Sequence, residues 1–245
     1  KFMCKVSIGK QDYESLIKSG CFYVDKTYFI KEWWESQDDV TLIIRPRRFG
    51  KTLNMSMLEC FFSNKYAGRG DLFEGLSIWN DEKYRQLQGT YPVIFISFAE
   101  IKANNFKDTK NDMVSVINDI YKQHSYLLED DMLTDANRYL LKGDLLSDNE
   151  KEQFVNVKAN MNSIGVVDAI KLLAGYMERY YGKKVIILID EYDVPLDKAF
   201  QNGYYREMVS LIRAMFGDAL KTNDFLQFAV LTGCLRVSKE SIFTG

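Results

Sequence analysis

The stretch of sequence that decides the fold reads Thr41-Leu42-Ile43-Ile44-Arg45-Pro46-Arg47-Arg48-Phe49-Gly50-Lys51-Thr52. Its first four residues predict a buried strand, and its last eight approach the phosphate-loop pattern G-x-x-x-x-G-K-[ST]. Gly50 would let the backbone approach an anion closely, because it has no β-carbon. Lys51 would reach phosphate oxygens, and Thr52 would offer its hydroxyl to Mg²⁺. The stretch therefore predicts a phosphate-binding loop between a strand and a helix.

The loop departs from the full pattern at its first position. Arg45 stands where a glycine is usual, and a bare G-K-[ST] triplet also occurs in ordinary surface turns. The context favours a phosphate loop, because a strand precedes the triplet and an apolar helix follows it, with its N–H groups aimed at the anion. Arg47 and Arg48 either add positive charge around the phosphates or are simply solvated. The residues expected to contact a nucleotide here are Arg45, Pro46, Arg47, Arg48, Phe49, Gly50, Lys51, Thr52 and Leu53.

A second motif follows the strand predicted at residues 185–189. This strand is apolar throughout, as expected when both faces are covered, and it ends in Asp190 and Glu191. Such an ending is the expected form of a Walker B motif. Asp190 would hold Mg²⁺ through a water, and Glu191 would act as general base toward the attacking water. The alternative is a strand that ends in solvated acids, and Asp193 beyond it either tunes the site or is a solvated loop acid.

The strand predicted at residues 226–231 is followed by further polar candidates. Thr232 would sense the γ-phosphate of a bound nucleotide, or its hydroxyl would cap the backbone at the strand end. Arg236 would contact phosphate, either in its own chain or in a neighbouring subunit. The predicted catalytic residues are therefore Lys51, Glu191, Thr232 and Arg236.

Strands and helices alternate along the chain, which predicts an α/β fold with a mostly parallel sheet. We expect a single three-layer α/β/α domain of the P-loop type over residues 1–245, with residues 1–40 preceding the first strand. Residues 102–163 are polar and predict a helical insertion after the second strand, with a solvated charged face. Strands are predicted at 41–44, 93–97, 185–189 and 226–231, and helices directly after Thr52, at 164–181 and at 204–222.

The composition argues against several classes of protein. A net charge of −2 and 27% charged residues do not indicate a generally nucleic-acid-binding surface. Four widely spaced cysteines and one histidine make a zinc site improbable and suggest reduced thiols in a cytoplasmic protein. No apolar run approaches the ~18 residues of a membrane span, and no signal-peptide pattern is present.

Four motifs match one known family as a set. They are Phe22-Tyr23-Val24-Asp25-Lys26-Thr27, then Arg45 to Thr52, then Leu188-Ile189-Asp190-Glu191-Tyr192-Asp193, then Thr232-Gly233 with Arg236-Val237-Ser238-Lys239-Glu240-Ser241-Ile242-Phe243. The set resembles the AAA-ATPase-like family of bacteria and archaea, and the resemblance runs nearly end to end. An arginine in place of the first glycine is usual in that family.

The resemblance implies ATP as ligand and a sensor strand between the two motif strands. It also implies a C-terminal domain like the PD-(D/E)XK nucleases, which this chain lacks, so we expect the chain to be a fragment. By analogy with related ATPases, Tyr23, Val24 and Asp25 would lie near adenine. The alternative, which the aromatic side chains favour, is that Phe22 and Tyr23 belong to the core. No N-K-x-D guanine signature is present, which favours ATP over GTP.

Three functions are compatible with these motifs. The first is Mg²⁺-dependent ATP hydrolysis that switches an attached effector domain. The second is a nucleotide-binding regulatory module with negligible turnover. The third is a nucleic-acid-associated protein that uses Arg45, Arg47 and Arg48. We expect ATP and ADP as ligands, a possible homo-oligomer, nucleic acid only through the missing C-terminal domain, and no membrane contact.

Overall fold

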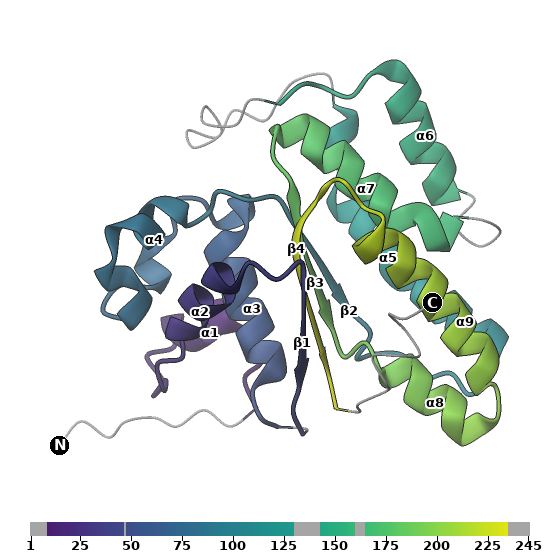
Figure 1. The fold of residues 1–245 in the computed structure, drawn as a ribbon, viewed down its shortest axis with the longest axis horizontal. Coiled ribbons are helices and arrows are strands. Elements are labelled where there is room, and N and C mark those ends of the chain that lie inside the picture. Colours follow the sequence, from purple (N-terminus) through teal and green to yellow (C-terminus); the bar gives the residue numbers. More distant parts are fainter. Residues whose placement is uncertain (1–8, 47, 130–142, 160–164, 235–245) are drawn as a thin grey trace.

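A computed structural model describes residues 9–46, 48–129, 143–159 and 165–234 of the chain. In these residues four parallel strands form one sheet in the order β1-β4-β3-β2 (Figure 1). Every strand end agrees with its predicted position to within two residues. The structure thus confirms an α/β fold with a parallel sheet. The strands are β1 (Val40–Ile44), β2 (Val93–Ser97), β3 (Val185–Asp190) and β4 (Leu226–Gly233).

Helices fill the connections between the strands. Among the residues that the structure describes, four helices lie before β2 and five after it, together with short 3₁₀ turns. The helices are α1 (Tyr13–Lys18), α2 (Tyr28–Ser36), α3 (Lys51–Phe62), α4 (Glu82–Leu87), α5 (Phe106–Gln123), α6 (Asp148–Ala159), α7 (Val166–Tyr181), α8 (Val194–Asn202) and α9 (Tyr205–Phe216); the 3₁₀ turns are Asn64–Tyr66, Gly70–Leu72, Ser77–Asn80 and Ser125–Leu128, and a π turn spans Gly217–Lys221.

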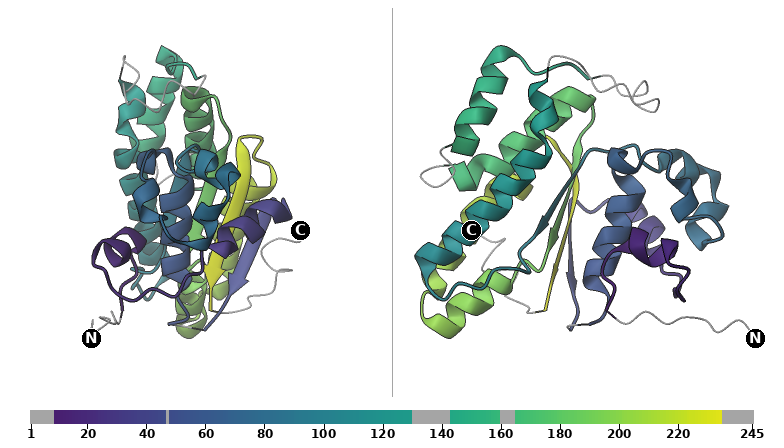
Figure 2. Two further views of the ribbon diagram at one scale, coloured as in Figure 1. Left: turned by 90° about the vertical axis from the view of Figure 1, so that its left-hand side faces the viewer. Right: turned by 180° about the vertical axis from the view of Figure 1, so that it is seen from behind.

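The sheet is the middle layer of three. Along β3, Ile186 and Leu188 face a core shared with α1 to α4, whereas Ile187 and Ile189 face a core shared with α5 to α9. Figure 2 shows the two groups of helices on opposite sides of the sheet. Every residue of β3 is buried, and each buried apolar side chain contributes about 1.5–3 kcal/mol. The centre of the sheet is therefore firmly held.

The region predicted as a helical insertion contributes to this packing. It contains α5 and α6, and α5 places Met113, Ile117 and Tyr121 in the core beside α7 while Lys107 stays exposed. Helices are thus present where the sequence predicts them, but only one face of α5 is solvated. The polar composition concealed an apolar stripe at helical spacing.

The order of the strands brings three strand ends together at one edge. β4 lies between β1 and β3, with Thr232 opposite Ile43 and Leu231 opposite Ile189. The strand arrows point toward the bottom of Figure 1, so the carboxyl ends of β1, β4 and β3 lie side by side there. Open α/β sheets place ligands at this edge.

No helix in the described part of the chain is both long and apolar enough to cross a bilayer.

Candidate nucleotide-binding site

The phosphate-loop lysine lies at the start of α3 and is almost completely buried. Gly50 is the N-cap of this helix in a left-handed conformation (φ 76°), and no side chain caps the helix. Lys51 is 5% exposed, and its Nζ donates to the carbonyl oxygens of Arg45 at 2.9 Å and Pro46 at 3.3 Å. The first N–H groups of a helix have no partner within it. Buried ammonium and helix N-terminus together form a site with positive potential.

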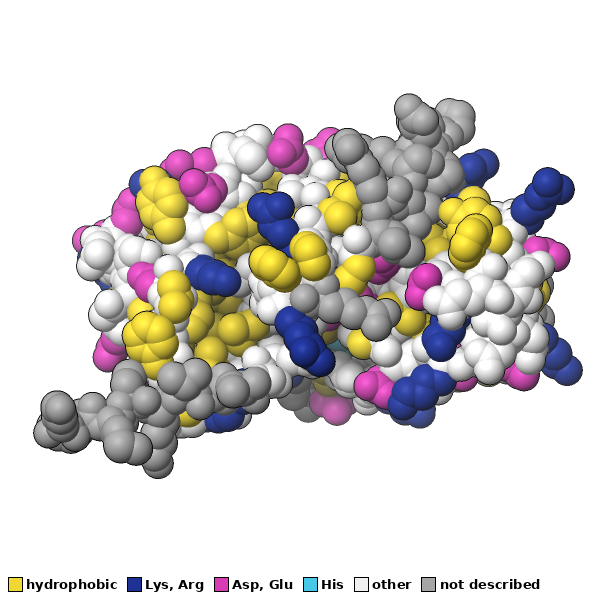
Figure 3. Space-filling view, turned by 90° about the horizontal axis from the view of Figure 1, so that it is seen from below, with side chains coloured by type: hydrophobic (Ala, Val, Ile, Leu, Met, Phe, Trp, Pro, Cys, Tyr) yellow, Lys and Arg dark blue, Asp and Glu magenta, His cyan; other side chains and the backbone are white. Residues whose placement is uncertain are grey.

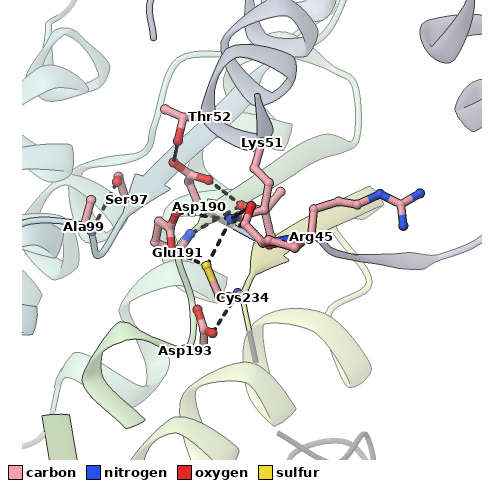
Figure 4. A network of polar contacts seen from close by, with 11 residues as sticks. Arg45, Lys51, Thr52, Ser97, Ala99, Asp190, Glu191, Asp193 and Cys234 are labelled. Carbon is pink, nitrogen blue, oxygen red and sulfur yellow. Dashed lines mark hydrogen bonds and ion pairs between the residues drawn. The ribbon is translucent and has the colours of Figure 1, made fainter. Parts of the chain in front are cut away.

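The arginines of the loop lie at the surface. Arg45 and Arg48 are exposed, as is Phe49, and the Arg45 guanidinium points away from the acidic residues in Figure 4. Arg48 has a positive φ of 69°, which is uncommon outside glycine. Arg47 lies outside the described residues. Figure 3 shows this edge of the molecule, with Lys and Arg side chains near the middle of the face.

Asp190 is held between two threonine hydroxyls. Its side chain is fully buried at the end of β3, where Thr52 donates to Oδ2 at 2.8 Å and Thr232 donates to Oδ1. Figure 4 shows Thr52 of α3 beside Asp190. Because Thr232 comes from β4, the carboxylate joins three elements. The predicted Mg²⁺ residues, Thr52 and Asp190, are thus in direct contact although 138 positions separate them.

Glu191 faces the lysine from the other side. Its Oε1 lies 3.7 Å from Lys51 Nζ, and its N–H donates to Thr232 Oγ1 at 3.4 Å. Burial raises the pKa of the Glu191 carboxyl; Lys51 opposes this rise, and Asp190 and Asp193 add to it. Glu191 also has a positive φ of 54°, a conformation that costs a non-glycine residue of order 1–3 kcal/mol and is found mainly at functional sites.

Thr232 therefore touches both acids. Its hydroxyl is fully buried, donating to Asp190 and accepting from the Glu191 N–H. These contacts match the alternative of a strand-end hydroxyl that caps its neighbours. A sensor role for Thr232 stays a prediction, as does the role of Arg236, which lies outside the described residues.

Two further residues belong to this network: Cys234, which sequence reasoning did not place in the site, and Asp193, for which it left a role in the site open. Cys234 Sγ lies 3.1 Å from Lys51 Nζ, and the Cys234 N–H donates to Asp193 Oδ2 at 2.8 Å. Asp193 is 2% exposed and is not the solvated loop acid that the sequence allowed. A β-carbon on Gly233 would lie 2.8 Å from Asp193 Oδ1, so glycine is required for this close approach. The Gly233–Cys234 pair directly after Thr232 was the available signal.

Tyr23 and Asp25, which precede α2 and were expected near adenine, make contacts within the protein. Tyr23 is directed toward the core, where its hydroxyl donates to Met57 Sδ at 3.3 Å and its ring packs edge-on against Tyr13. Asp25 accepts hydrogen bonds from Thr27 and from the Ser77 N–H. These contacts anchor the segment and support the core alternative for Tyr23. Leu53, in the first turn of α3, packs against the apolar core of that side.

The donor set suits a magnesium–phosphate group. Within the described residues no three His, Cys, Asp or Glu side chains converge to hold a metal by themselves. Mg²⁺ usually takes only one or two carboxylates and completes its octahedron with phosphate oxygens and waters. Asp190 and Thr52 offer such a partial set beside a helix N-terminus. The carboxylates of Asp190, Glu191 and Asp193 outnumber the single ammonium of Lys51, which favours an added cation.

Comparison with known proteins gives two matches. A family model described as "Predicted AAA-ATPase" matches residues 7–243. A protein of Azotobacter chroococcum mcd 1, described as "Uncharacterized protein in vnfD 5'region", is 27% identical over 245 residues. That match covers 98% of this chain and 39% of the Azotobacter protein, so the chain spans well under half of its relative. No solved structure matches.

Proposed function

This chain belongs to the predicted AAA-ATPase family, and from that premise we propose that it binds ATP with Mg²⁺ at the carboxyl edge of its sheet and hydrolyses the ATP. One observation carries the proposal: Lys51 and Thr52, which follow β1, lie against Glu191 and Asp190, which end β3. A cationic loop on a helix N-terminus and a buried acid pair are the two parts that phosphoryl transfer requires.

In this proposal the loop holds the phosphates. Lys51 exchanges its bonds to the Arg45 and Pro46 carbonyls for bonds to phosphate oxygens, and the first N–H groups of α3 donate to the same anion. Arg45 and Arg48 add positive charge at the rim. Mg²⁺, when bound, neutralises the charge that develops on the phosphates, and Asp190 and Thr52 are the residues that would hold it.

In this proposal Glu191 is the general base, and Thr232 positions the two acids. Glu191 accepts a proton from the attacking water, and its raised pKa brings the carboxylate closer to the range in which a general base works at neutral pH. Thr232 positions both acids through its two hydrogen bonds. Because Glu191 must be ionised to accept a proton, we expect hydrolysis to fall on the acid side at a pH above the ordinary glutamate pKa of 4.5.

The first test is phosphate release from ATP in the presence of Mg²⁺. Lys51→Ala and Glu191→Gln should each lower the rate by about 100-fold or more, because each removes a group that acts on the reacting phosphate or water. Lys51→Ala should also weaken ATP binding, whereas Glu191→Gln should retain it. Lys107→Ala, an exposed lysine of α5, serves as control. Equal rates in all four proteins would rule out the assignment.

A second candidate is nucleotide binding without significant turnover. It is favoured by the contact between Glu191 and Lys51, because a base paired with the loop lysine is not directed at a water. The measurement that separates the two candidates is a thermal shift with ATP. Binding at about 100 times Kd should stabilise the fold by roughly 2.7 kcal/mol in either case. Stabilisation without phosphate release would support the binding module.

We further propose that hydrolysis switches a domain attached to this one. The chain covers 39% of its Azotobacter relative, which leaves length for an effector. The test is phosphate release by residues 1–245 alone and by the same residues within a longer protein that carries the proposed effector domain; a difference in rate is expected if the two parts are coupled.

A further inference from the structure

The segment over residues 21–27 leads into α2, and most of its side chains lie at the surface. Phe22, Val24 and Lys26 are exposed, with Phe22 at 56% and Val24 at 59%. Asp25 is also exposed, whereas Tyr23 is half-buried and packs toward the core. The exposed side chains of this segment are therefore the ones that can meet a ligand.

Hydrogen bonds hold the segment in place. The Asp25 carboxylate accepts from the Thr27 N–H at 2.8 Å, the Thr27 hydroxyl at 2.7 Å and the Ser77 N–H at 2.8 Å. Although burial opposes it, these hydrogen bonds lower the pKa of the Asp25 carboxyl, which is therefore ionised at neutral pH. Thr27 itself is fully buried. Lys26 is thus carried by a segment that these hydrogen bonds hold in place.

Lys26 reaches the phosphate loop. Its Nζ lies 3.7 Å from the position that a β-carbon on Gly50 would take. Gly50 is the N-cap of α3, so the ammonium lies beside the positive end of that helix. A cation at a helix N-terminus is unfavourable by a few tenths to about 1 kcal/mol, unless an anion lies between them. The adjacent Asp25 is engaged by Thr27 and Ser77, so it does not supply that anion.

We propose that Lys26 is a second phosphate-contacting cation, which reaches the polyphosphate of the bound nucleotide from outside the loop. The inference rests on the proposed function and deepens it. It assigns the exposed side chain of Lys26 to the ligand and gives Asp25 and Thr27 the role of positioning it. A nucleoside di- or triphosphate would then bridge Lys26 and the N-terminus of α3, which removes the repulsion between the two.

The experiment is equilibrium binding of ATP, with inorganic triphosphate as competitor, to residues 1–245. Lys26→Ala should weaken the binding of both ligands by about tenfold, as the loss of a charge-assisted hydrogen bond does. Equal loss for the two ligands identifies a phosphate contact, whereas loss for ATP alone would place Lys26 against the nucleoside and overturn the proposal. Lys26→Arg should restore most of the affinity, and Lys107→Ala should leave it unchanged.

The two levels of the proposal fail in different ways. If the wild-type protein binds ATP and Lys26→Ala binds it equally well, the role of Lys26 is refuted and the proposed function stands. If the wild-type protein binds neither ligand, both are refuted. Without ligand, Lys26→Ala should be as stable toward heat as wild type or slightly more stable, because the substitution removes the repulsion between the ammonium and the N-terminus of α3. A Lys26→Glu variant, with the opposite charge, should lose more affinity than Lys26→Ala.

Discussion

The two halves of the candidate site differ in how they are held. The acidic half, at the ends of β3 and β4, is buried: Asp190 is 0%, Asp193 2% and Thr232 0% exposed. The cationic half, around the loop after β1, buries only Lys51 and leaves Arg45 and Arg48 exposed at the surface. Two hydroxyls donate to Asp190, and the Cys234 N–H donates to Asp193.

This difference indicates which half of the site depends on the packing of the fold. Buried carboxylates are stable only when their hydrogen bonds are made, so the acidic half depends on neighbouring strands being in register. An exposed cation needs no such support, because water solvates it. We therefore expect substitutions in the acidic half to change stability, and substitutions in the cationic half to change ligand affinity.

The largest effect should come from packing at the end of β4. A β-carbon on Gly233 would lie 2.6 Å from Tyr192 Cε1 and 2.8 Å from Asp193 Oδ1. Gly233→Ala should therefore lower the free energy of unfolding by about 2–3 kcal/mol through overpacking. Urea denaturation measures this change.

The matched substitution in the cationic half is Gly50→Ala. Its β-carbon would meet only the flexible end of Lys26, so the positive φ of 76° should be its main cost, about 1 kcal/mol. Gly203→Ala, with φ 82° and open space around it, gives the cost of the backbone conformation alone. If Gly233→Ala is no more destabilising than these two, the contrast between the halves is wrong.

An intermediate effect should separate the two threonines that hold Asp190. Thr232→Val removes a fully buried donor and should cost about 1–2 kcal/mol, because Asp190 Oδ1 then loses its partner away from water. Thr52 is only partly buried, so water can replace its hydroxyl, and Thr52→Val should cost less than about 1 kcal/mol. Thermal and urea unfolding of both variants test this order. A larger loss for Thr52→Val would reverse the comparison.

The smallest effect concerns the pH dependence of stability. The pKa of Glu191 is raised above its ordinary value of 4.5 in the folded protein. At pH values between 4.5 and the folded pKa, the folded state therefore binds more protons than the unfolded state. Its contribution to stability is therefore lost as the pH rises through the folded pKa. At pH 7, Glu191→Gln should be more stable than wild type by less than about 1 kcal/mol, because the group is partly exposed to solvent screening.

The measurement is the difference in unfolding free energy between Glu191→Gln and wild type from pH 4 upward. This difference should grow with pH in the direction of a more stable variant and then level off. A variant that is less stable than wild type at pH 7 would show that the ion pair with Lys51 outweighs the cost of burying the carboxylate.

Several parts of the site could be read from the sequence because they depend on neighbours along the chain. The loop before Lys51 follows an apolar strand, and Asp190 with Glu191 ends another. Their positions follow from strand propensity and from glycine, which act over a few residues. The pairing of the two motifs was predictable because parallel strands present their carboxyl ends at one edge.

Other parts could not be read because they depend on direction within the fold. Tyr23, one of the residues expected at the ligand, packs toward the core, and Asp25 is hydrogen-bonded to Ser77, whereas Lys26 reaches the loop. Which side chain of this segment meets α3 depends on the path of the chain through the fold. Nothing in the local sequence shows that path.

By itself, the sequence determined the four strands, the helices between them, the phosphate-loop pattern and the acid pair, because each is encoded by residues close together in the chain. The family resemblance implied a strand between the two motif strands, which is where β4 lies. Only the tertiary structure decided that Thr232 meets Asp190 and that Cys234 meets both Lys51 and Asp193. Those contacts join residues about 40 to 180 positions apart, which is set by strand order and register, and no short-range preference specifies them.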